Sequence, residues 1–198
     1  MFKILEKKAI MHNEFDIWID APRIARNGRA GQFCVLCPTE TGERIPLTIA
    51  DYDREGGRIR MIFQVVGKTT NQLAHLEVGD SIHDILGPLG RPSEIENYGT
   101  VLMIGGGVGI AALYPILKAL KEAGNKTITI LGGRTSNLVI MKDECAKYSD
   151  ELLITTDDGS EGIKGVVTTA MDMLAQRGEK VDYCWAIGPS IMMKFASM

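Results

Sequence analysis

The sequence predicts two domains in series, a small antiparallel β-barrel and an α/β domain with a doubly wound parallel sheet. Short strand-like runs separated by turn residues fill the chain up to about residue 97. After Tyr98-Gly99 the pattern becomes strand, helix, strand, helix, which is typical of parallel sheets with crossover helices. A length of 198 residues accommodates two small domains. We therefore expect the barrel over 1–97 and the α/β domain over 98–198.

The barrel is predicted from alternation and spacing. Phe15, Ile17 and Ile19 alternate with Asp16, Trp18 and Asp20, which is the period of a half-buried strand. Further runs of strand length cover 32–37, 45–50, 59–66 and 81–86, and a short helix is expected over 70–76. Five or six strands at this spacing favour a closed or nearly closed antiparallel barrel.

The α/β domain is predicted from four apolar runs of strand length, over 101–104, 128–131, 152–155 and 183–187. Between the first two runs, Leu113, Ile116, Leu117 and Leu120 recur at the spacing of one helical face, and Gly124 ends that helix. A second helix of the same type begins at Val167 and ends before Gly178.

Composition and charge exclude several classes of protein. The hydrophobic share of 45% supports a globular core, and a net charge of −3 argues against a nucleic-acid-binding surface. No apolar run approaches the roughly 18–20 residues needed to span a bilayer. The first eight residues lack the apolar stretch of a signal peptide, so we expect a cytoplasmic protein.

Cysteine and histidine spacing predicts no metal site. Cys34 and Cys37 form a C-x-x-C pair within a strand-like run, where residues three apart point to opposite faces. Cys145 and Cys184 are too scattered for a disulfide framework. The three histidines lie in unrelated segments without ligand spacing.

The glycine-rich turn Gly105-Gly106-Gly107-Val108-Gly109 is the strongest local signal. It follows an apolar strand and precedes a helix, where glycine lets backbone N–H groups approach a pyrophosphate at the helix N-terminus. A purely structural strand-to-helix turn remains the alternative, because the spacing departs from G-x-G-x-x-G. Arg134 stands after the next strand, where a ribose-binding acid is expected, which argues against a simple NAD dehydrogenase and permits a phosphorylated ribose. The loop 157–160 follows the third strand and is either a plain loop or a nucleotide contact.

Seven motifs in order give the chain a family resemblance that covers almost its entire length. It resembles the ferredoxin–NADP reductase superfamily, and within it the small flavoprotein subunits of NADH-dependent ferredoxin–NADP oxidoreductase (sulfide dehydrogenase) and the electron-transfer subunits of dihydroorotate dehydrogenase. The motifs lie at 30–33, 43–48, 64–70, 85–90, 105–115, 156–160 and 187–194.

The resemblance implies an FAD site on the barrel. Pro46, Leu47 and Thr48 would line the flavin ring, with the Thr48 hydroxyl as the catalytic group beside the reactive nitrogen. Ile62, Phe63 and Gln64 would border the ring and the ribityl chain. Gly67, Thr69 and Thr70, at the start of the short helix, would receive the FAD pyrophosphate. From the residues alone, an ordinary strand and a helix N-cap are the simpler interpretations.

The resemblance also implies a nicotinamide nucleotide site on the α/β domain, with NADH or NADPH left open. Its residues come from the turns at the ends of the strands: Gly105, Gly106, Gly107, Val108, Gly109, Arg134, Thr135, Asp158, Gly188, Pro189 and Met192.

Three departures from the family pattern stand out. Ile45 occupies the place of the arginine that usually pairs with the pyrophosphate, and Arg44 lies one residue earlier on the opposite face. Ile187 stands where many relatives carry cysteine. Close relatives also continue into a cysteine run that ligates a [2Fe–2S] cluster, and the four cysteines here lack that spacing. We expect the sequence to be a fragment whose α/β domain is truncated at its C-terminus; a cluster-free version is the alternative.

The expected function is electron transfer. NAD(P)H would pass hydride to FAD, and electrons would continue to a larger flavoprotein or iron–sulfur subunit in a hetero-oligomer, or to ferredoxin. Cofactors that react by themselves need no acid–base dyad from the protein. Two alternatives remain at this point: a non-catalytic nucleotide-binding regulatory module, and a stand-alone flavin reductase.

Overall fold

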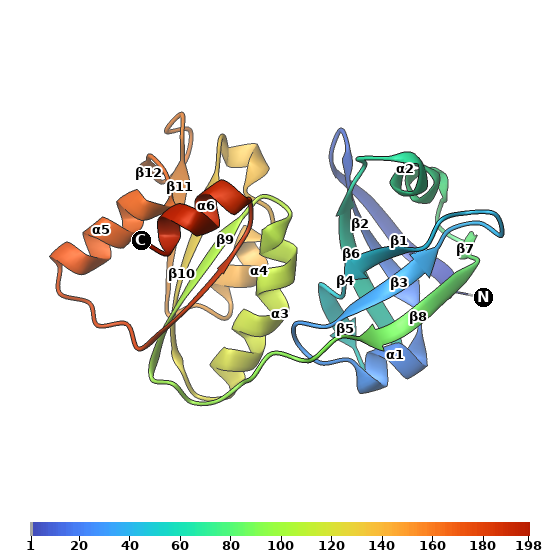
Figure 1. Ribbon diagram of the computed structural model, residues 1–198, viewed down its shortest axis with the longest axis horizontal. Helices are drawn as coiled ribbons and strands as arrows, with labels where there is room; N and C mark the ends of the chain where they lie inside the picture. The colour runs from blue at the N-terminus through green and yellow to red at the C-terminus, as the bar shows by residue number, and fades with distance from the viewer. Residues whose placement is uncertain (1) are drawn as a thin grey trace. The chain divides into compact units, whose positions relative to one another are not determined.

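The computed structural model describes residues 2–198, and the chain folds into two compact units. The first ends at Ser93, and the second runs from Glu94 to Met198. Figure 1 shows strands alone forming the sheets of the first unit and strands alternating with helices in the second.

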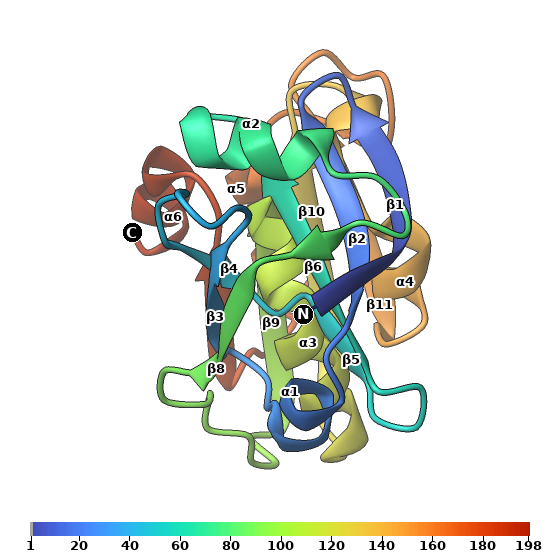
Figure 2. The ribbon, with the colours of Figure 1, turned by 90° about the vertical axis from the view of Figure 1, so that its right-hand side faces the viewer.

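The first unit is a barrel-like pair of antiparallel sheets, which confirms the predicted fold class. A five-stranded sheet has the order β5-β6-β2-β1-β7, and a three-stranded sheet has the order β4-β3-β8. The strands are β1 (Phe2–Met11), β2 (Glu14–Asp20), β3 (Phe33–Cys37), β4 (Ile45–Thr48), β5 (Asp51–Asp53), β6 (Arg58–Gln64), β7 (Ser81–Ile82) and β8 (Asp84–Leu89). Helices α1 (Pro22–Asn27) and α2 (Lys68–His75) lie at opposite ends of this unit (Figures 1 and 2).

The core of the first unit follows from alternation along its strands. Ile17 and Ile19 are fully buried on β2, and in the antiparallel register they lie opposite Met61 and Ile59 of β6, which are also fully buried. Apolar side chains therefore cover the face of the sheet that points into the core of the barrel, while polar side chains lie on the outer face. On the outer face Arg60 holds Asp16 through two hydrogen bonds of 2.9 and 2.6 Å.

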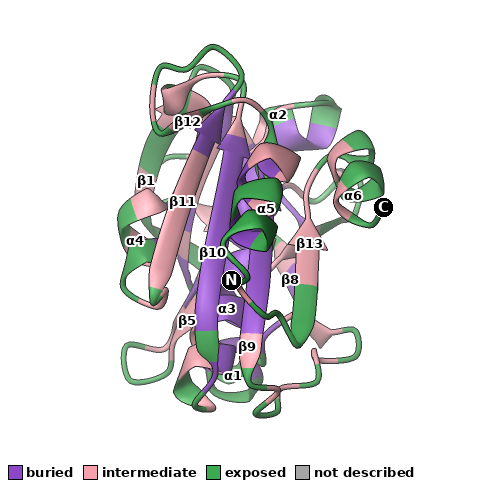
Figure 3. Ribbon diagram, turned by 90° about the vertical axis from the view of Figure 1, so that its left-hand side faces the viewer, coloured by how far each residue is buried: buried purple, intermediate pink, exposed green. Residues whose placement is uncertain are grey.

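The second unit is a five-stranded parallel sheet of order β12-β11-β10-β9-β13. Helices α3 and α4 lie on one face, and α5 and α6 lie on the other (Figures 1 and 3). The elements are β9 (Thr100–Gly106), α3 (Gly109–Glu122), β10 (Lys126–Gly133), a 3-10 turn (Ser136–Leu138), α4 (Lys142–Ala146), β11 (Glu151–Thr156), β12 (Ile163–Lys164), α5 (Val167–Gln176), β13 (Tyr183–Ile187) and α6 (Ser190–Ala196). This arrangement is the predicted doubly wound parallel sheet.

Strands β9 and β10 form the buried centre of the second sheet, as the colouring of Figure 3 shows. Helices on both faces exclude water, so these strands are nearly continuous apolar runs. α3 contributes a buried stripe that includes Leu113, Leu117 and Leu120. β13, at the edge of the sheet, is more exposed.

The structure adds elements that the sequence analysis does not predict: β1, α1, β5, α4 and β12. Most are only two to six residues long, too short for periodicity to identify. α2 begins at Lys68 rather than at 70, and the run predicted over 81–86 is two strands that meet at His83.

The four cysteines are free thiols, three of them buried and Cys184 exposed. The Cys37 thiol lies 3.0 Å from the carbonyl oxygen of Thr39 and 3.1 Å from that of Gly42, so it donates within its own loop. Burial raises the pKa of Cys34 to about 12. Over 2–198 no group of three His, Cys, Asp or Glu side chains is arranged to hold a metal ion. Within the same residues no helix is long and apolar enough to cross a bilayer.

Candidate functional site

The turn between β6 and α2 is held by the side chain of Thr70. The Thr70 hydroxyl accepts hydrogen bonds from the backbone N–H groups of Val66 (3.0 Å) and Gly67 (3.1 Å), and it donates to the Gly67 carbonyl (3.0 Å). These three hydrogen bonds of the Thr70 hydroxyl fix the start of α2. It leaves the N–H groups of the first helical turn, from Lys68 onward, pointing out of the helix without intrahelical partners.

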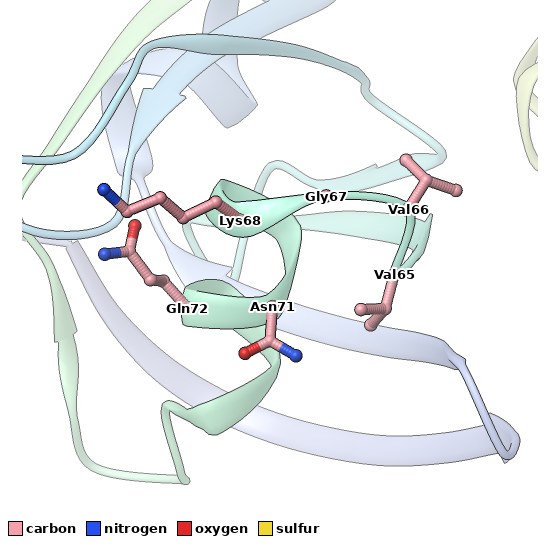
Figure 4. Close-up of a pocket in the computed structure, with 6 residues that line it drawn as sticks. All are labelled: Val65, Val66, Gly67, Lys68, Asn71 and Gln72. Carbon is pink, nitrogen blue, oxygen red and sulfur yellow. The ribbon is translucent and has the colours of Figure 1, made fainter.

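A pocket of about 600 Å³ opens at this helix N-terminus. Figure 4 shows its lining, with Lys68 and Gln72 extending on one side of the helix and Val65 and Val66 on the other. Gly67 and Asn71 complete the lining. Gly67 has an extended backbone (φ −166°), and a Cβ placed there would meet nothing within 4 Å. Packing therefore does not require glycine at this position, and the space beside it is open to a ligand.

Two oxygens near this turn are buried without a hydrogen-bond partner. They are the Thr69 hydroxyl, on a residue only 4% exposed, and the Gln72 side-chain carbonyl. Buried polar atoms are normally paired, so such atoms need an explanation. Both oxygens are also shielded from solvent, so in this conformation neither is open to a ligand.

Strand β4 divides its side chains between the core and the surface. Ile45 and Leu47 pack against the core, while Pro46 is exposed and Thr48 is half-buried. Thr48 lies opposite Phe33 of β3 in the register. Pro46 and Thr48 thus share the outer face of this strand, and Leu47 has only its backbone available there.

Strand β6 leads from the sheet to the pocket. Phe63 is 2% exposed and stacks on Phe15 in the core, with ring centroids 5.7 Å apart, so only its backbone can reach a ligand. Ile62 is buried outside that core cluster, and Gln64 is half-buried. Opposite Gln64 in the register stands Glu14, a buried acid whose pKa is raised by burial and whose Oε2 has no partner.

The glycine turn of the second unit is shaped by close packing at three of its positions. A Cβ on Gly105 would meet Leu113 and Ile110 side chains at 3.0–3.1 Å, and one on Gly109 would lie 2.7 Å from the Gly188 backbone. Gly107 differs, because it has φ +54° and a Cβ there would meet nothing within 4 Å. A turn with this conformation at the start of α3 matches an anion-binding strand-to-helix junction.

The β13–α6 turn packs directly on the glycine turn. Cβ atoms built on Gly106 and Gly188 would lie 2.6 and 2.7 Å from the side chain of Met192, and Pro189 lies 3.4 Å from the Gly106 position. The structure therefore brings 105–109 together with Gly188, Pro189 and Met192, as the family resemblance implies.

The loops after β10 and β11 also lie side by side. The N–H of Asp158 donates to the Arg134 carbonyl (3.2 Å), and the N–H of Ser136 donates to the Ser160 hydroxyl (2.8 Å). Thr135 bonds to Asn137 through its hydroxyl. Hydrogen bonds from Ser160 lower the pKa of Asp158, and the Arg134 side chain is exposed. These loops occupy the carboxyl edge of the parallel sheet, where ligands of such sheets bind.

The sequence analysis does not single out three residues that the structure places around this pocket or at the end of β6. Lys68 and Gln72 line the pocket, and Glu14 lies opposite Gln64 in the strand register. Lys68 and Gln72 are four residues apart, so a helix beginning at 68 places them on one face beside Gly67. With the helix expected only from 70, that spacing carried no meaning. The burial of Glu14 depends on packing that no local pattern reveals.

Comparisons with known proteins show which family the chain belongs to. Residues 103–198 match the family model for the oxidoreductase NAD-binding domain. The chain is 57% identical over 196 residues to a Thermotoga maritima protein named dihydroorotate dehydrogenase B (NAD(+)), electron transfer subunit homolog; the match covers 99% of this chain and 69% of the relative. It is 32% identical to the Streptococcus pneumoniae (strain R6) dihydroorotate dehydrogenase B (NAD(+)) electron transfer subunit, over 98% of this chain and 75% of that protein.

Solved structures agree. An NADH-dependent reduced ferredoxin-NADP oxidoreductase structure, described for flavin-based electron bifurcation, superposes with a TM-score of 0.93 at 56% identity, over 100% of this chain and 71% of that chain. A flavohemoglobin from Malassezia yamatoensis shares the fold at 19% identity with a TM-score of 0.75, over 98% of this chain and 54% of that one. The chain belongs to the ferredoxin reductase-like oxidoreductases, within the family of the dihydroorotate dehydrogenase B electron transfer subunits.

Proposed function

We propose that this protein is an FAD-containing electron-transfer subunit that passes hydride between NAD(P)H and FAD and passes electrons on to a partner. The first unit is the FAD-binding domain, and the second is the NAD(P)-binding domain. The observation that carries the FAD assignment is the pocket at the start of α2, with open space beside Gly67 and unsatisfied N–H groups at its mouth.

The residues at this pocket fit a flavin dinucleotide. The free N–H groups of the first turn of α2 can receive the pyrophosphate, because the positive end of the helix dipole favours an anion there. Thr70 acts indirectly, by holding the turn that presents these groups.

For the flavin ring, we propose the outer face of β4 and the end of β6. Pro46 would supply an apolar surface, and we assign the Thr48 hydroxyl on the same face as the hydrogen-bond partner of the reactive edge of the ring. Ile62 and Gln64 border the ring and the ribityl chain, while Leu47 and Phe63 contribute backbone only, since their side chains pack into the core. Bound FAD supplies the redox chemistry, and the protein orients it and shields it from water.

For NAD(P)H, we propose the carboxyl edge of the second sheet. The N–H groups of the Gly105–Gly109 turn bind the pyrophosphate. Gly188, Pro189 and Met192 close over the nicotinamide half, and Arg134, Thr135 and Asp158 border the adenosine half. The Arg134 guanidinium can donate hydrogen bonds to either a hydroxyl or a phosphate on the ribose, so the proposal covers NADH and NADPH.

Two of the relatives are named as electron transfer subunits, which supports a hetero-oligomer with a larger catalytic subunit. Ferredoxin is a further candidate acceptor, because the 56% identical solved structure is that of an NADH-dependent reduced ferredoxin-NADP oxidoreductase. The cysteines of residues 2–198 do not fit a [2Fe–2S] cluster, because they lie on β3, α4 and β13 and form no ligand group. Four free thiols also suit a reducing compartment, so we propose that the protein works in the cytoplasm.

An absorbance spectrum of the purified protein tests the proposal, followed by addition of NADH and of NADPH without oxygen. A flavin band near one equivalent that is bleached by either nucleotide supports it. A protein that binds nucleotide but no flavin would be a regulatory module. A protein that reduces added flavin without retaining it would be a flavin reductase.

The variant Gly67→Val tests whether the flavin binds in the pocket at the start of α2. The extended backbone at Gly67 is one that valine adopts, and a Cβ there meets no atom within 4 Å, so the chain should still fold, with a small loss of stability at the helix start, while flavin binding is lost. Ala9→Val, at an exposed position of β1 outside the pocket lining, is the control. Retention of a full flavin band by Gly67→Val would place the flavin elsewhere.

A further inference from the structure

Glu14, the first residue of β2, is a buried acid without a partner. Among residues 2–198 it is the only side chain with a carboxylate, ammonium or guanidinium group that is buried, at 5% exposed. Its Oε2 atom is shielded from solvent and has no hydrogen-bond partner, and among the described residues no ion pair involves its carboxyl group. A buried charge without a partner is costly, and titratable groups in such surroundings are concentrated at functional sites.

The strands on either side of Glu14 place uncharged residues opposite it. β2 pairs with β1 and with β6, and the residues directly opposite Glu14 are Met11 and Gln64. Such residues of an antiparallel pair have Cα atoms about 4.5–5.5 Å apart, and their side chains share one face of the sheet. Burial, with no opposing cation, raises the pKa of the Glu14 carboxyl group.

The charged groups along the same face are either paired or exposed. Asp16, two residues further along β2, accepts hydrogen bonds of 2.9 and 2.6 Å from Arg60 of β6. Lys8 of β1 stands opposite Asp16 and is exposed, and His12 is exposed in the turn directly before β2. Protons from solvent can therefore reach the end of the strand, while no cation among the described residues neutralises Glu14.

Gln64 connects this acid with the proposed flavin site. It is the last residue of β6, is half-buried, and in the proposed function borders the ring and the ribityl chain. Glu14 is thus one strand away from a residue that contacts the cofactor. A negative charge that arrives near a buried carboxylate favours the protonated form of that carboxyl group.

We propose that Glu14 is a proton-binding site whose protonation is coupled to reduction of the flavin. This inference rests on the proposed function, and Glu14 acts through its charge rather than by contact. A hydride from NAD(P)H carries one negative charge to the cofactor. A proton from solvent binds an oxygen of the Glu14 carboxylate and forms an O–H bond, and no electron moves to or from Glu14. The total charge around the cofactor then stays the same, which favours reduction over the case of a permanently ionised acid.

The first part of the test uses the flavin-free full chain. Because the folded-state pKa of Glu14 lies above the unfolded value of about 4.3, the cost of ionising it is absent at low pH and appears as pH rises through that value. Glu14→Gln, which keeps the shape without the charge, should gain several degrees of melting temperature over wild type on going from pH 4 to pH 7. Glu40→Gln, at an exposed glutamate between β3 and β4, should show no such pH-dependent gain.

The second part uses the flavin-loaded protein in spectroelectrochemical titrations. The midpoint potential of wild type should fall more steeply with pH than that of Glu14→Gln, over the range between the pKa of Glu14 before reduction and its higher value afterwards. Glu14→Asp keeps a titrating group and should restore the steeper slope, and Glu40→Gln should follow wild type. Should Glu14→Gln not fold, infrared difference spectra of wild type decide instead, because reduction should add the C=O band of a protonated carboxyl group.

The outcomes separate this inference from the proposed function. A chain that binds no flavin ends both, whatever the melting curves show. If flavin binds and the potentials of wild type and Glu14→Gln run parallel across pH, or if no carboxyl band appears on reduction, only the coupling to Glu14 is overturned. Equal differences in melting temperature at pH 4 and pH 7 would overturn it as well, because Glu14 would then not be an uncompensated acid.

Discussion

Thr69 and Thr70 are neighbours with opposite tasks. Thr70 uses its hydroxyl fully inside the protein, as acceptor for two N–H groups and donor to a carbonyl. Thr69 is just as buried, but its hydroxyl has no partner among the described residues. Thr70 therefore holds the turn through hydrogen bonds, whereas Thr69 contributes to it through burial alone.

The two threonines make a matched pair for mutagenesis. Thr70→Val should lower the free energy of unfolding by about 1–2 kcal/mol, since it removes a helix cap and leaves two N–H groups unpaired. Thr69→Val should leave it nearly unchanged, because no internal hydrogen bond is lost. Urea unfolding of the flavin-free protein measures both, and equal losses would contradict the assignment.

Thr48 provides the prediction for catalysis. Thr48→Ala should slow reduction of the bound flavin by NAD(P)H about fivefold, the effect of losing one hydrogen bond of about 1 kcal/mol. Stopped-flow absorbance measures this rate at saturating nucleotide. Thr48→Ser, which keeps the hydroxyl, should restore most of it. An unchanged rate in the alanine variant, with flavin still bound, would remove Thr48 from the site.

At the scale of elements, the strand-to-helix junction of β9 and α3 combines two kinds of glycine. Gly109 is required by neighbouring backbone, since a Cβ there would lie 2.7 Å from Gly188 and Ile187, while Gly105 and Gly106 are packed closely against side chains. Gly107 is required by its conformation alone and faces open space. Only Gly107 therefore allows packing and nucleotide binding to be separated.

Gly107→Asn is the variant that separates them. Asparagine tolerates a positive φ, so stability should change little, while its side chain should block the pyrophosphate and raise the Kd for NAD(P)H at least tenfold. Gly178→Asn is the control, because Gly178 also has a positive φ (+75°) and open space but follows α5, away from the turn. Titration with NADH and thermal unfolding give the two readouts. Unchanged affinity in Gly107→Asn would make the glycine turn purely structural.

The elements that the sequence predicts are those whose pattern is repeated over many residues. The runs later found as β9, β10, β11 and β13 and the faces of α3 and α5 are read directly from apolar periodicity. α1 is different: proline usually interrupts secondary structure, but Pro22 occupies the first turn of this six-residue helix, whose Ile24 and Ala25 side chains are buried. Tertiary packing decides such short elements.

For the site, sequence locates backbone turns better than side-chain roles. The glycine turn and the Gly67–Thr70 turn lie where the family pattern puts them, at the starts of helices. The inward direction of Leu47 and Phe63, and the pairing of Arg44 with Asp84, depend on contacts between distant segments. No spacing along the chain encodes those contacts.

At the scale of the whole molecule, each unit has a core of its own, so each has its own stability. In the second unit the carboxylate of Asp150, which lies just before β11, links α3 to β10. Its carboxylate accepts from Lys121 at 2.6 and 2.7 Å and from the N–H of Thr127 at 2.8 Å. The Lys121 hydrogen bond and then that of Thr127 lower the pKa of Asp150.

This predicts a pH dependence of known sign. Because the folded-state pKa lies below the unfolded value of about 3.9, the stabilisation is complete above that value and is lost as pH falls through the folded pKa. Asp150→Asn should lower the melting temperature of the second unit at pH 7 and flatten its decline between about pH 5 and 2. Asp172→Asn, an exposed carboxyl on α5, is the control. Parallel pH curves for wild type and Asp150→Asn would contradict the assignment.

The burial of three thiols makes this protein suitable for site-selective chemistry. In the native state a thiol reagent such as maleimide should react with Cys184 alone, slowly, because partial burial of the sulfur raises its pKa as well. Mass spectrometry should find one adduct on the folded chain and four after unfolding. Since Cys184 lies on the edge strand β13, three residues before the Ile187-Gly188-Pro189 turn, an attached fluorophore would report nucleotide binding without any engineered cysteine.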